Sequence, residues 1–511
     1  MKPPVDPPSS YLARDYASFR ELLLADLKAR VPDTGDLPVA SIEMTLVEAM
    51  AYLGDYLAYQ QDAAASEAYV QTANHRASLA RHSVLLGKRI DEGCCARTLV
   101  RFETHADEVR VPAQSQLLTR LAQTEQFGVS GDEVSEQPTG FLTLQPITIR
   151  AAHTALALAG GDEAPLAHAR QAVIHDGKSA AGIARGDFAI LHHSPSGFLH
   201  PVRLTRVHEM GSRVMVHWGV WDALPDAAGT LSDATQGWEL WGNIALAQEG
   251  RWEEVRESLA LDPVRRLAEV EAPPPGYAAS IADPPGEIRS AANLLNPDPE
   301  YAEPQLKLVE KWDINGHEDP SATWHACRSL AEVDNDARVF VPEAFGRKRM
   351  VLRFSREPGA PSPDGVPLFA RHLVGRGSRG NIAPRALKHM VDGDPRILDA
   401  TNPLAATGGS DPEDHETARQ RLLNDCTDRS KLRCVSKTDY EVLAAHFPGV
   451  AGVLVEIFRP STVRKVAISV SLIEGVKPDG YADELATFVR ARAPVSDIVS
   501  VTVVGEEADT A

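Results

Sequence analysis

The chain has 511 residues, of which 43% are hydrophobic and 24% are charged, and its formal net charge is −19. This length and composition predict about two to four domains with a substantial core, and they exclude wholesale disorder and a small disulfide-stapled scaffold. The acidic balance also excludes a protein whose main work is binding DNA or RNA, because that binding depends on Lys and Arg side chains that neutralise phosphates.

Cysteine usage and the amino terminus indicate a cytoplasmic protein. The chain has five cysteines without Cys-x-x-Cys spacing, which we expect to be reduced thiols: Cys94, Cys95, Cys327, Cys426 and Cys434. The first residues, MKPPVDPPSS, lack the apolar core of a signal peptide, and no run of about 18 apolar residues follows. We therefore expect a soluble chain that is made in the cytoplasm.

Three amphipathic patterns near the amino terminus predict helices at 11–31, 41–70 and 74–86. We expect Pro32 to end the first helix and Gly87 to cap the third. These helices carry more apolar surface than a hairpin can hide, so in the region 1–95 they should pack on one another or on a neighbouring subunit. The stripe expected at this interface is Leu46, Met50, Leu53 and Leu57, with Ile42 before it and Tyr52, Tyr56 and Tyr59 beside it.

The middle of the chain changes to short runs of β-forming residues, for example at 98–102 and from Asp187, His200 and Ser212 onward. We expect a β-rich domain at 96–270 and a β-rich continuation at 306–370. Between them, residues 271–305 hold eight prolines in 35 residues. This density predicts a linker or an extended arm without regular structure.

The carboxy-terminal part, 371–511, is expected to form one α+β domain. Ser410 with Glu413, and Thr438 with Glu441, match the reciprocal capping box that opens a helix. Pro448 should stop the second of these helices. The order that follows is strand, strand, helix and strand, at 450–458, 463–473, 481–492 and 498–504.

That order is typical of a ferredoxin-like sandwich, in which helices cover one face of an antiparallel sheet. The expected fold class is therefore a multidomain α+β protein. It has a helical amino-terminal region, a β-rich middle and a ferredoxin-like carboxy-terminal domain.

Two glycine-rich stretches raise the question of a nucleotide site. In NPLAATGGSDPEDHE, at 402–416, acidic residues follow the paired glycines and would repel a phosphate, so this stretch is interpreted as a helix start. GRGSRG, at 375–380, matches the dinucleotide pattern, and Asp399 follows about 20 residues on. Pro384, however, stands where the following helix should continue. A nucleotide-dependent oxidoreductase that uses GRGSRG stays an alternative.

No other pattern predicts catalysis or a metal. The histidines of the β-rich region lack ligand spacing such as H-E-x-x-H and are interpreted as surface or hydrogen-bonded residues: His192, His193, His200, His208 and His217. Cys94 and Cys95 are interpreted as a small pair at a turn. We therefore expect no enzyme activity and no catalytic, cofactor-binding or metal-binding residue. A glycan-binding tail accessory protein stays a second alternative.

Residues 338–388 form a basic segment in an acidic chain, with eleven Lys and Arg against three Asp and Glu. Such a segment is typical either of a solvated basic face or of a contact with acidic surface on another subunit. The candidates for this contact are Arg347, Lys348, Arg349, Arg353, Arg376 and Arg379.

Two regions together resemble known families. TLVEAMAYLGDYLAYQQDAAASEAYVQTANHRASLARHSVLLGKRI resembles the helical start of putative baseplate assembly proteins. The carboxy-terminal part is similar to the baseplate J family, in which a G-x-G-x-x-G-N turn, an N-P…G-G-x-D-x-E segment and a [ST]-x-x-D-[YF]-E helix recur in this order. The matching residues are Gly375, Gly377, Gly380, Asn381, Asn402, Pro403, Gly408, Gly409, Ser410, Asp411, Glu413, Thr438, Asp439, Tyr440 and Glu441.

The resemblance implies a structural wedge subunit in the baseplate of a contractile phage tail or phage tail-like injection system. Copies would join in a ring around the central spike, or hub, and the inner tube, and would couple the baseplate to sheath contraction. The partners implied are a second wedge protein, copies of the same chain and the baseplate protein that initiates the sheath. No cofactor, nucleic acid or direct membrane insertion is implied. The chain would be made in the bacterial cytoplasm and become part of the particle.

Overall fold

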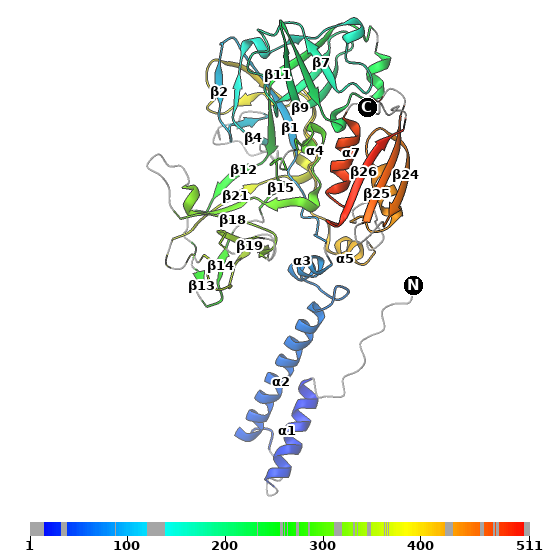
Figure 1. The fold of residues 1–511 in the computed structure, drawn as a ribbon. Coiled ribbons are helices and arrows are strands. Elements are labelled where there is room, and N and C mark those ends of the chain that lie inside the picture. Colours follow the sequence, from blue (N-terminus) through cyan, green and yellow to red (C-terminus); the bar gives the residue numbers. More distant parts are fainter. Residues whose placement is uncertain are drawn as a thin grey trace. The chain divides into compact units, whose positions relative to one another are not determined.

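In the computed structural model the chain divides into two units, residues 1–90 with 414–424 and residues 91–413 with 425–511. Figure 1 shows the elements in chain order. The fold is α+β with helices at the amino terminus, as expected. The structure describes residues 15–31, 38–86, 88–119, 138–231, 233–255, 259, 261–262, 264–271, 275–284, 287–310, 319–330, 333–334, 336–344, 349–361, 363, 365, 367–424, 433–459, 464–473, 476 and 480–504.

The first unit consists of helices, which confirms the expected helical start. They are α1 (Tyr16–Arg30), α2 (Ile42–Glu67), α3 (Arg76–Leu85) and α5 (His415–Asn424). The Ser41 hydroxyl accepts a hydrogen bond from the Met44 amide at 3.1 Å and so caps α2. Pro32 and Gly87, which were expected to end helices, lie outside the described residues. Among the described helices, none combines the length and the apolarity needed to cross a membrane.

One side of α2 packs on α1. The buried residues of α2 lie on this side at helical spacing, whereas α1 buries none of its own residues. Gly54 lies in the same stripe, where a Cβ would come within 2.9 Å of the Phe19 ring. The ring therefore packs directly on the α2 backbone. The buried residues of α2 are Met44, Val47, Ala51 and Ala58.

A second cluster in this unit joins α3 to α5. The Arg419 guanidinium on α5 donates to the Ala73 carbonyl at 2.7 Å, and Arg421 donates to the Arg89 carbonyl at 2.7 Å. The apolar residues between these contacts are Ala73, Leu79, Ile90, Ala418 and Leu422.

The second unit contains an 11-stranded sheet built around β11 (Trp238–Glu249). β11 pairs with β1 (Arg97–Thr104) and β8 (Phe188–His193), and β8 leads into β9 (Phe198–Met210) and β10 (Arg213–Trp218). These strands confirm the β runs expected from the sequence. The others are β3 (Gln116–Leu118), β4 (Gly140–Thr143), β6 (Leu156–Ala157), β7 (Gln171–Ile174), β22 (His389–Met390) and β23 (Ile397–Thr401), while β2 (Val109–Val111) pairs separately with β5 (Ile147–Ile149).

An eight-stranded sheet continues from β11 through Gly250. Its core is aromatic, with Trp324 edge-on to Phe354 at a centroid distance of 5.4 Å and Phe340 beside them. Its strands, in spatial order, are β12 (Arg251–Glu254), β21 (Phe369–Val374), β17 (Leu306–Val309), β18 (Thr323–Ala326), β19 (Val339–Ala344), β20 (Met350–Phe354), β14 (Leu267–Val270) and β13 (Leu261–Asp262).

The proline-rich stretch 271–305 is not devoid of regular structure, so that expectation is wrong. It contains β15 (Tyr277–Ala279), which pairs with β16 (Ala302–Pro304), and the short helix α4 (Ala291–Leu295). The buried side chains of α4 pack on the 11-stranded sheet beside Leu99 and Ile244. Local proline density did not reveal this tertiary packing.

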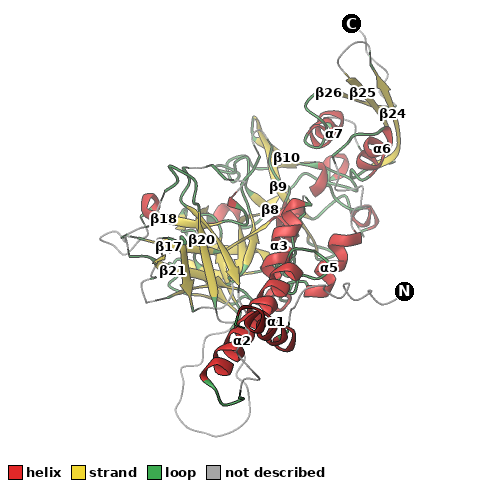
Figure 2. Cartoon of the chain, turned by 90° about the horizontal axis from the view of Figure 1, so that it is seen from below, coloured by secondary structure: helices red, strands yellow, loops and turns green. Residues whose placement is uncertain are grey.

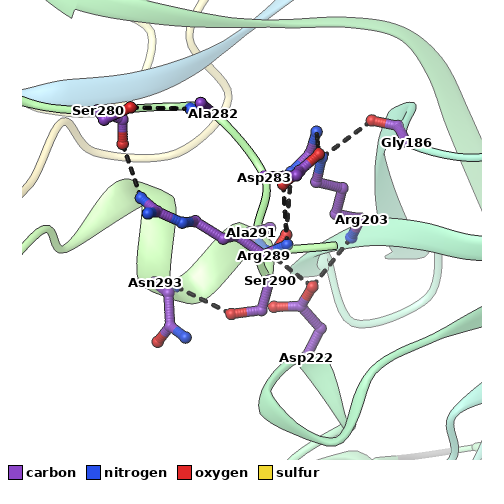
Figure 3. Close-up of polar contacts among 10 residues, drawn as sticks. All are labelled: Gly186, Arg203, Asp222, Ser280, Ala282, Asp283, Arg289, Ser290, Ala291 and Asn293. Atoms are coloured by element: carbon purple, nitrogen blue, oxygen red, sulfur yellow. Dashed lines mark hydrogen bonds and ion pairs between the residues drawn. The ribbon is translucent and has the colours of Figure 1, made fainter. Parts of the chain in front are cut away.

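The buried carboxylate of Asp222 holds the start of α4 (Figure 3). It accepts hydrogen bonds from the backbone amides of Ala291 at 2.8 Å and Arg203 at 3.0 Å, which Figure 3 draws, and from the amide of Ala292 at 3.0 Å. Burial raises the pKa of Asp222 to about 6, although the three amides oppose this rise. The Arg203 guanidinium in turn binds both oxygens of Asp283, at 2.6 and 2.9 Å, and so fixes the chain that leads into α4.

The carboxy-terminal elements follow the expected order: α6 (Lys437–Ala445), β24 (Val450–Phe458), β25 (Arg464–Leu472), α7 (Tyr481–Arg490) and β26 (Asp497–Val503). The expected antiparallel sheet is wrong in one respect, because β26 runs parallel to β25. The crossover through α7 returns the chain in the same direction, which requires a parallel pair. The ferredoxin-like assignment is not confirmed.

The turn η3 (Val220–Asp222) contacts the carboxy-terminal helices as well as α4. Val220 is buried among the side chains of α6 and α7, and Trp221 lies edge-on to Phe447 at a centroid distance of 5.6 Å. The Val220 amide donates to the Glu484 carboxylate at 3.3 Å. From residues 371–424, in contrast, β21, β22 and β23 pair with earlier strands of the two large sheets. The expected five-segment domain boundaries stay a prediction.

We expect Asp222→Asn to lower the stability of this unit by about 2–4 kcal/mol, because the amide group turns its NH2 toward at least one buried backbone N–H whichever way it faces. The midpoint of thermal unfolding and the rate of proteolytic cleavage within 280–290 measure the effect. Asp226→Asn, on the exposed surface of the neighbouring turn, is the matched control. Equal midpoints for the two variants would contradict the anchoring role of Asp222.

Candidate functional site

Two of the three carboxy-terminal motifs, the glycine turn and the N-P…G-G-x-D-x-E segment, meet at one place, which we call the loop junction: residues 91–97, 375–381 and 402–413 of the second unit. Backbone hydrogen bonds join Cys94 to Ser410 in both directions at 3.0 Å, and Arg97 to Thr407 at 2.8 and 2.9 Å. The structure therefore brings together motif residues that are far apart in the sequence.

A carboxylate closes the glycine turn at 375–380. The Asp411 carboxylate accepts hydrogen bonds from the Ser378 amide, at 3.0 Å, and from the Ser378 hydroxyl. Gly377 has a φ of +55°, and a Cβ there would come within 2.2 Å of Asp411 Oδ1. Only glycine fits this position, both for its backbone angle and for its space. The two hydroxyl and amide contacts hold the pKa of Asp411 below its usual value.

Asn381 and Gly409 form a reciprocal pair. The Asn381 side chain donates to the Gly409 carbonyl at 2.8 Å and accepts from the Gly409 amide at 2.9 Å. A Cβ on Gly409 would lie 2.5 Å from the Gly377 carbonyl and 2.9 Å from the Ala96 Cβ. The two glycine motifs of the family pattern therefore pack directly on each other.

Asn402 and Gly408 extend the loop junction. The buried Asn402 side chain accepts from the Leu387 amide at 2.9 Å and donates to the carbonyls of Ala383 and Leu404 at 2.9 and 2.8 Å. Pro403, next to it, is also buried. Gly408, with a φ of +76°, approaches the end of α4, where a Cβ would meet the Leu295 carbonyl at 2.7 Å.

Glu249, the last residue of β11, is a buried carboxylate beside the loop junction that was not predicted from the sequence. Both of its oxygens accept from the Arg376 amide at 3.1 Å, and burial raises its pKa to about 7. Gly375 and Gly380 leave room for it, since a Cβ on either would meet Glu249 atoms at 3.4 and 2.8 Å. One signal was available, because Glu249 is an isolated acid that ends the apolar run IALAQ.

Cys95 fills the remaining space beside Gly375 and Gly276, where a Cβ on either glycine would meet its sulfur at 2.7 and 2.9 Å. Burial raises the pKa of the Cys94 and Cys95 thiols. Thiols with raised pKa values are poor nucleophiles at neutral pH. The geometry agrees with the interpretation of this pair as packing residues at a turn.

The arrangement of the GRGSRG turn does not suit a dinucleotide. The amides that would bind a pyrophosphate, those of Arg376 and Ser378, already donate to Glu249 and Asp411. Two carboxylates therefore stand where the phosphates would lie, and they repel an anion. The turn leads into a short 3-10 helix, Gly377–Gly380, and not into the long helix of a dinucleotide-binding unit.

Both expected capping boxes are wrong. Ser410 pairs with Cys94 and the Glu413 side chain accepts from the Asp91 amide at 2.8 Å, while Asp414 caps α5 by accepting from the amides of Glu416 and Thr417 at 3.0 Å. Contacts with residues 91–94 therefore replace the reciprocal bonds that were expected between Ser410 and Glu413.

At α6 the capping box is shifted by two residues from the expected pair Thr438 and Glu441. Ser436 is the N-cap and Asp439 its reciprocal partner, and the Glu441 carboxylate lies 3.6 Å from the Lys437 amine. Tyr440 is fully buried and donates to Asp497 at 2.7 Å. In α6, Asp439 therefore completes the N-terminal cap, and Tyr440 attaches the helix to β26 through its bond to Asp497.

The basic residues proposed for an interface are partly paired within the chain. Arg349 lies 2.6 Å from Glu269, and Arg353 lies 3.1 Å from Glu343. The Arg376 side chain donates to Thr139 at 2.8 Å, and Arg379 is close enough to Asp411 to lower its pKa. Arg347 and Lys348 lie outside the described residues. An interface role for these residues stays a prediction.

Three of the five histidines of the β-rich region have hydrogen-bond partners within the chain, while the exposed His208 lies edge-on to His217. His193 contacts the Ser196 hydroxyl at 2.7 Å, His200 contacts the Asp222 carbonyl at 3.0 Å and His192 contacts Glu239 at 3.1 Å. Over the described ranges, no group of three or more His, Cys, Asp or Glu residues is arranged to hold a metal ion.

The second candidate surface is the outer stripe of α2, formed by Leu46, Met50, Leu53 and Leu57. These side chains are 58%, 60%, 54% and 55% exposed, and they lie on a different side of α2 from the residues that contact α1. Tyr52, Tyr56 and Tyr59 form another exposed ridge on the same helix. In this unit the described elements leave much of α2 uncovered.

Residues 15–85, which include all of α1 and α2, match the family model described as "Bacteriophage baseplate protein, N-terminal domain". This confirms the resemblance to baseplate proteins. A structural part in a baseplate is the coarse function that the match supports. A comparison with curated proteins finds no match.

Solved baseplate structures show a distant likeness. The anti-feeding prophage (AFP) baseplate is similar at 11% identity and a TM-score of 0.25, over 94% of this chain and 70% of that chain. The type VI secretion system TssK-TssF-TssG baseplate subcomplex is similar at 10% identity and a TM-score of 0.38, over 90% of this chain and 96% of that chain. The baseplate complex from the type VI secretion system is similar at 10% identity and a TM-score of 0.36, over 96% of each chain. Scores this low carry no argument about function.

We expect Gly409→Ala to destabilise the second unit by about 1–3 kcal/mol, because the added methyl group has no space beside Gly377 and Asn381. Gly219→Ala is the control, since its φ is −75° and a Cβ there meets nothing within 4 Å. Thermal unfolding of both variants compares the two sites. If both midpoints match the wild type, the close approach at the loop junction is not a constraint.

Glu249 makes stability depend on pH. Its pKa is raised from the ordinary 4.5 to about 7 in the folded state. Between pH 4.5 and about pH 7 the folded chain therefore holds a proton that the unfolded chain has lost. The free energy of unfolding falls as pH rises through this range up to about 7, by on the order of 3 kcal/mol. We expect Glu249→Gln to raise the thermal midpoint at pH 8 and to change it little at pH 5. Glu209→Gln, at an exposed position, should change neither. An equal effect of Glu249→Gln at both pH values would contradict this assignment.

Proposed function

We propose that the chain is a structural, non-enzymatic wedge subunit in the baseplate of a phage tail-like contractile injection system. The observation that carries the proposal is the outer stripe of α2, an uncovered apolar surface on a helix that lies within the baseplate N-terminal domain match. An apolar stripe of this length on a helix is typical of a surface that is buried in an assembly.

The outer stripe has the spacing of a helix that packs on another helix. Residues at i, i+4, i+7 and i+11 form one ridge, which fits between the side-chain rows of a neighbouring helix. Burying each half-exposed side chain contributes about 1–2 kcal/mol. Four such residues together contribute about 4–8 kcal/mol, which is comparable to the lower estimates of the entropic cost of association, so the rest of a helix bundle must contribute as well.

The tyrosine ridge suggests that more than one neighbour surrounds α2. Tyr52, Tyr56 and Tyr59 are spaced at i, i+4 and i+7 and are all more than half exposed. Tyrosine is enriched at protein interfaces because its ring is apolar while its hydroxyl group keeps a polar partner. We infer that the outer stripe contacts helices of a second wedge protein and that the tyrosine ridge contacts a further helix of the same bundle.

The finer parts of the role come from the resemblance alone. We propose that copies of the chain join in a ring around the spike, or hub, and the inner tube. In this ring they would contact the sheath-initiating baseplate protein and couple the baseplate to sheath contraction.

The alternative functions have less support. Carboxylates occupy the amides of the GRGSRG turn, which counts against a nucleotide-dependent oxidoreductase. A glycan-binding role has no observation in its favour. The loop junction is better explained as structural, because the carboxylates of Asp411, Glu413 and the adjacent Glu249 accept from backbone amides of the chain itself.

We expect the double variant Leu53→Lys with Leu57→Lys to lose co-purification with the second wedge protein when the two are co-expressed, because two charged side chains in the outer stripe prevent its burial. Ala65→Lys, also at an exposed position of α2, adds a charge roughly a quarter turn around the helix from the stripe and should leave co-purification unchanged. Thermal unfolding of the second unit should be the same in all variants. If the double variant co-purifies as well as the wild type, the outer stripe does not contact the second wedge protein.

A further inference from the structure

The tyrosine ridge of α2 carries a carboxylate, which the outer stripe lacks. With Tyr52 as position i, Asp55 stands at i+3 and the other two tyrosines at i+4 and i+7, so the four residues share one face over two turns. The tyrosine side chains are 67%, 52% and 68% exposed in chain order, and Asp55 is half-buried. This face lies about a third of a turn around the helix from the outer stripe.

The described part of the first unit leaves this face open. Figure 1 and Figure 2 show α1 beside α2, and the Phe19 ring of α1 packs at Gly54, on the buried side of α2. Glu48, seven residues before Asp55, forms an ion pair with Arg20 of α1 at 3.5 Å. Within the described ranges Asp55 itself has neither a hydrogen bond nor an ion pair. The kind of contact that α1 makes at Glu48 is therefore not made at Asp55.

The charge of Asp55 selects which kind of neighbour can cover the ridge. A helix that presented only leucines would take the carboxylate out of water without a partner, and an unpaired buried charge is strongly destabilising. A neighbour with a cation opposite Asp55 avoids that cost. Arginine suits the position better than lysine, because its flat guanidinium group can stack on a tyrosine ring while two of its N–H groups donate to the carboxylate.

The rest of α2 favours a cationic neighbour as well. The helix contains five acidic residues and no Lys, Arg or His among its 26 residues, so its formal charge is −5. Two α2 helices side by side would therefore repel each other, whereas a helix rich in arginine is attracted. The acidic residues are Glu43, Glu48, Asp55, Asp62 and Glu67.

A second copy of the chain has no free cation to offer from the described helices of this unit. Every described Lys and Arg of α1, α3 and α5 already has a partner within its own chain. Arg30, for example, lies 2.8 Å from Asp26, and Arg419 lies 2.6 Å from Glu416. The ridge therefore fits a helix of a different protein better than it fits a second copy.

We propose that the tyrosine ridge binds a basic helix of another protein, with an arginine of that helix stacked on the tyrosine rings and paired with Asp55. The inference deepens the proposed function, on which it rests, by giving the chemistry of the further helix in the bundle. The two exposed sides of α2 then accept different neighbours, an apolar helix on the outer stripe and a basic helix on the ridge. Exchanging the two neighbours would leave Asp55 unpaired and bury arginine on leucine, so each helix finds its own side.

The test measures the binding of a labelled helical peptide to the full chain by fluorescence anisotropy. The probe is an alanine-rich peptide of three heptads with arginines along one face, and in the matched peptide glutamine replaces each arginine. At about 0.05 M salt we expect the arginine peptide to bind at least roughly tenfold more tightly, and at about 0.5 M salt most of this difference should disappear because the charges are screened. A lysine peptide should bind several-fold more weakly than the arginine peptide.

Variants of the ridge separate this site from a general attraction to an acidic chain. We expect Asp55→Asn to weaken binding of the arginine peptide about tenfold. Tyr52→Ala with Tyr59→Ala, which changes no charge, should weaken it about fivefold. Glu43→Gln is the matched control, since it removes the same charge from the opposite side of α2 and should change the affinity less than about twofold. Equal helix content by circular dichroism checks that α2 is intact in every variant.

An arginine peptide that fails to bind, or that binds no better than the glutamine peptide, would overturn the proposal. Equal losses of affinity from Asp55→Asn and Glu43→Gln would also count against it, because they would mean that the peptide responds to net charge alone. Sedimentation velocity of the chain gives a further outcome. If the chain self-associates and Tyr52→Ala with Tyr59→Ala abolishes this, a second copy occupies the ridge and the proposal is wrong.

The proposed function is scored separately, because it depends on the outer stripe. If Leu53→Lys with Leu57→Lys keeps the second wedge protein while the arginine peptide still distinguishes Asp55→Asn from Glu43→Gln, the proposed function fails and the ridge proposal stands. If the double variant loses that partner while the peptide does not distinguish the two ridge variants, the ridge proposal alone fails.

Discussion

The second unit depends on a close approach of backbone to backbone at the loop junction. Gly375, Gly377, Gly380 and Gly409 lie where a Cβ would collide with a neighbouring segment, so the three segments meet at distances that any side chain would forbid. The turn that results exposes amides inside the protein, and these amides need acceptors. Asp411 and Glu249 supply them.

This junction lies where the two large sheets are joined. β11 of the 11-stranded sheet ends at Glu249, and β12 of the eight-stranded sheet begins two residues later. β21 of the eight-stranded sheet ends at Val374, immediately before the glycine turn. At Gly250, with a φ of +137°, a Cβ would meet Leu373 at 2.7 Å. The motif residues of the loop junction therefore fix how one sheet leads into the next, which is a structural role.

Sequence reasoning succeeded where the signal was local. The stripe of α2 and the order of the carboxy-terminal elements follow from periodicity, which neighbouring residues determine. It failed where a segment distant in the sequence determines the structure. Ser410 bonds to Cys94 instead of capping α5. α4 forms in a proline-rich stretch because Asp222 binds its first amides and the 11-stranded sheet buries its side chains. At α6, Ser436 caps the helix and Thr438 does not, although both types of residue suit that position. The resemblance supplied the motif residues of the junction, whereas Glu249 lies outside the motifs and its contact with Arg376 needed the structure.

α1 buries none of its own residues and packs on a single side of α2. A helical hairpin with so little interior gains little free energy from folding alone, since most helical stability in proteins comes from packing. In the proposed assembly, this segment would become ordered in the same step in which a partner buries the outer stripe of α2. A copy without that partner would keep a loosely packed helical arm that proteases can cleave, so cleavage would remove unassembled chains first.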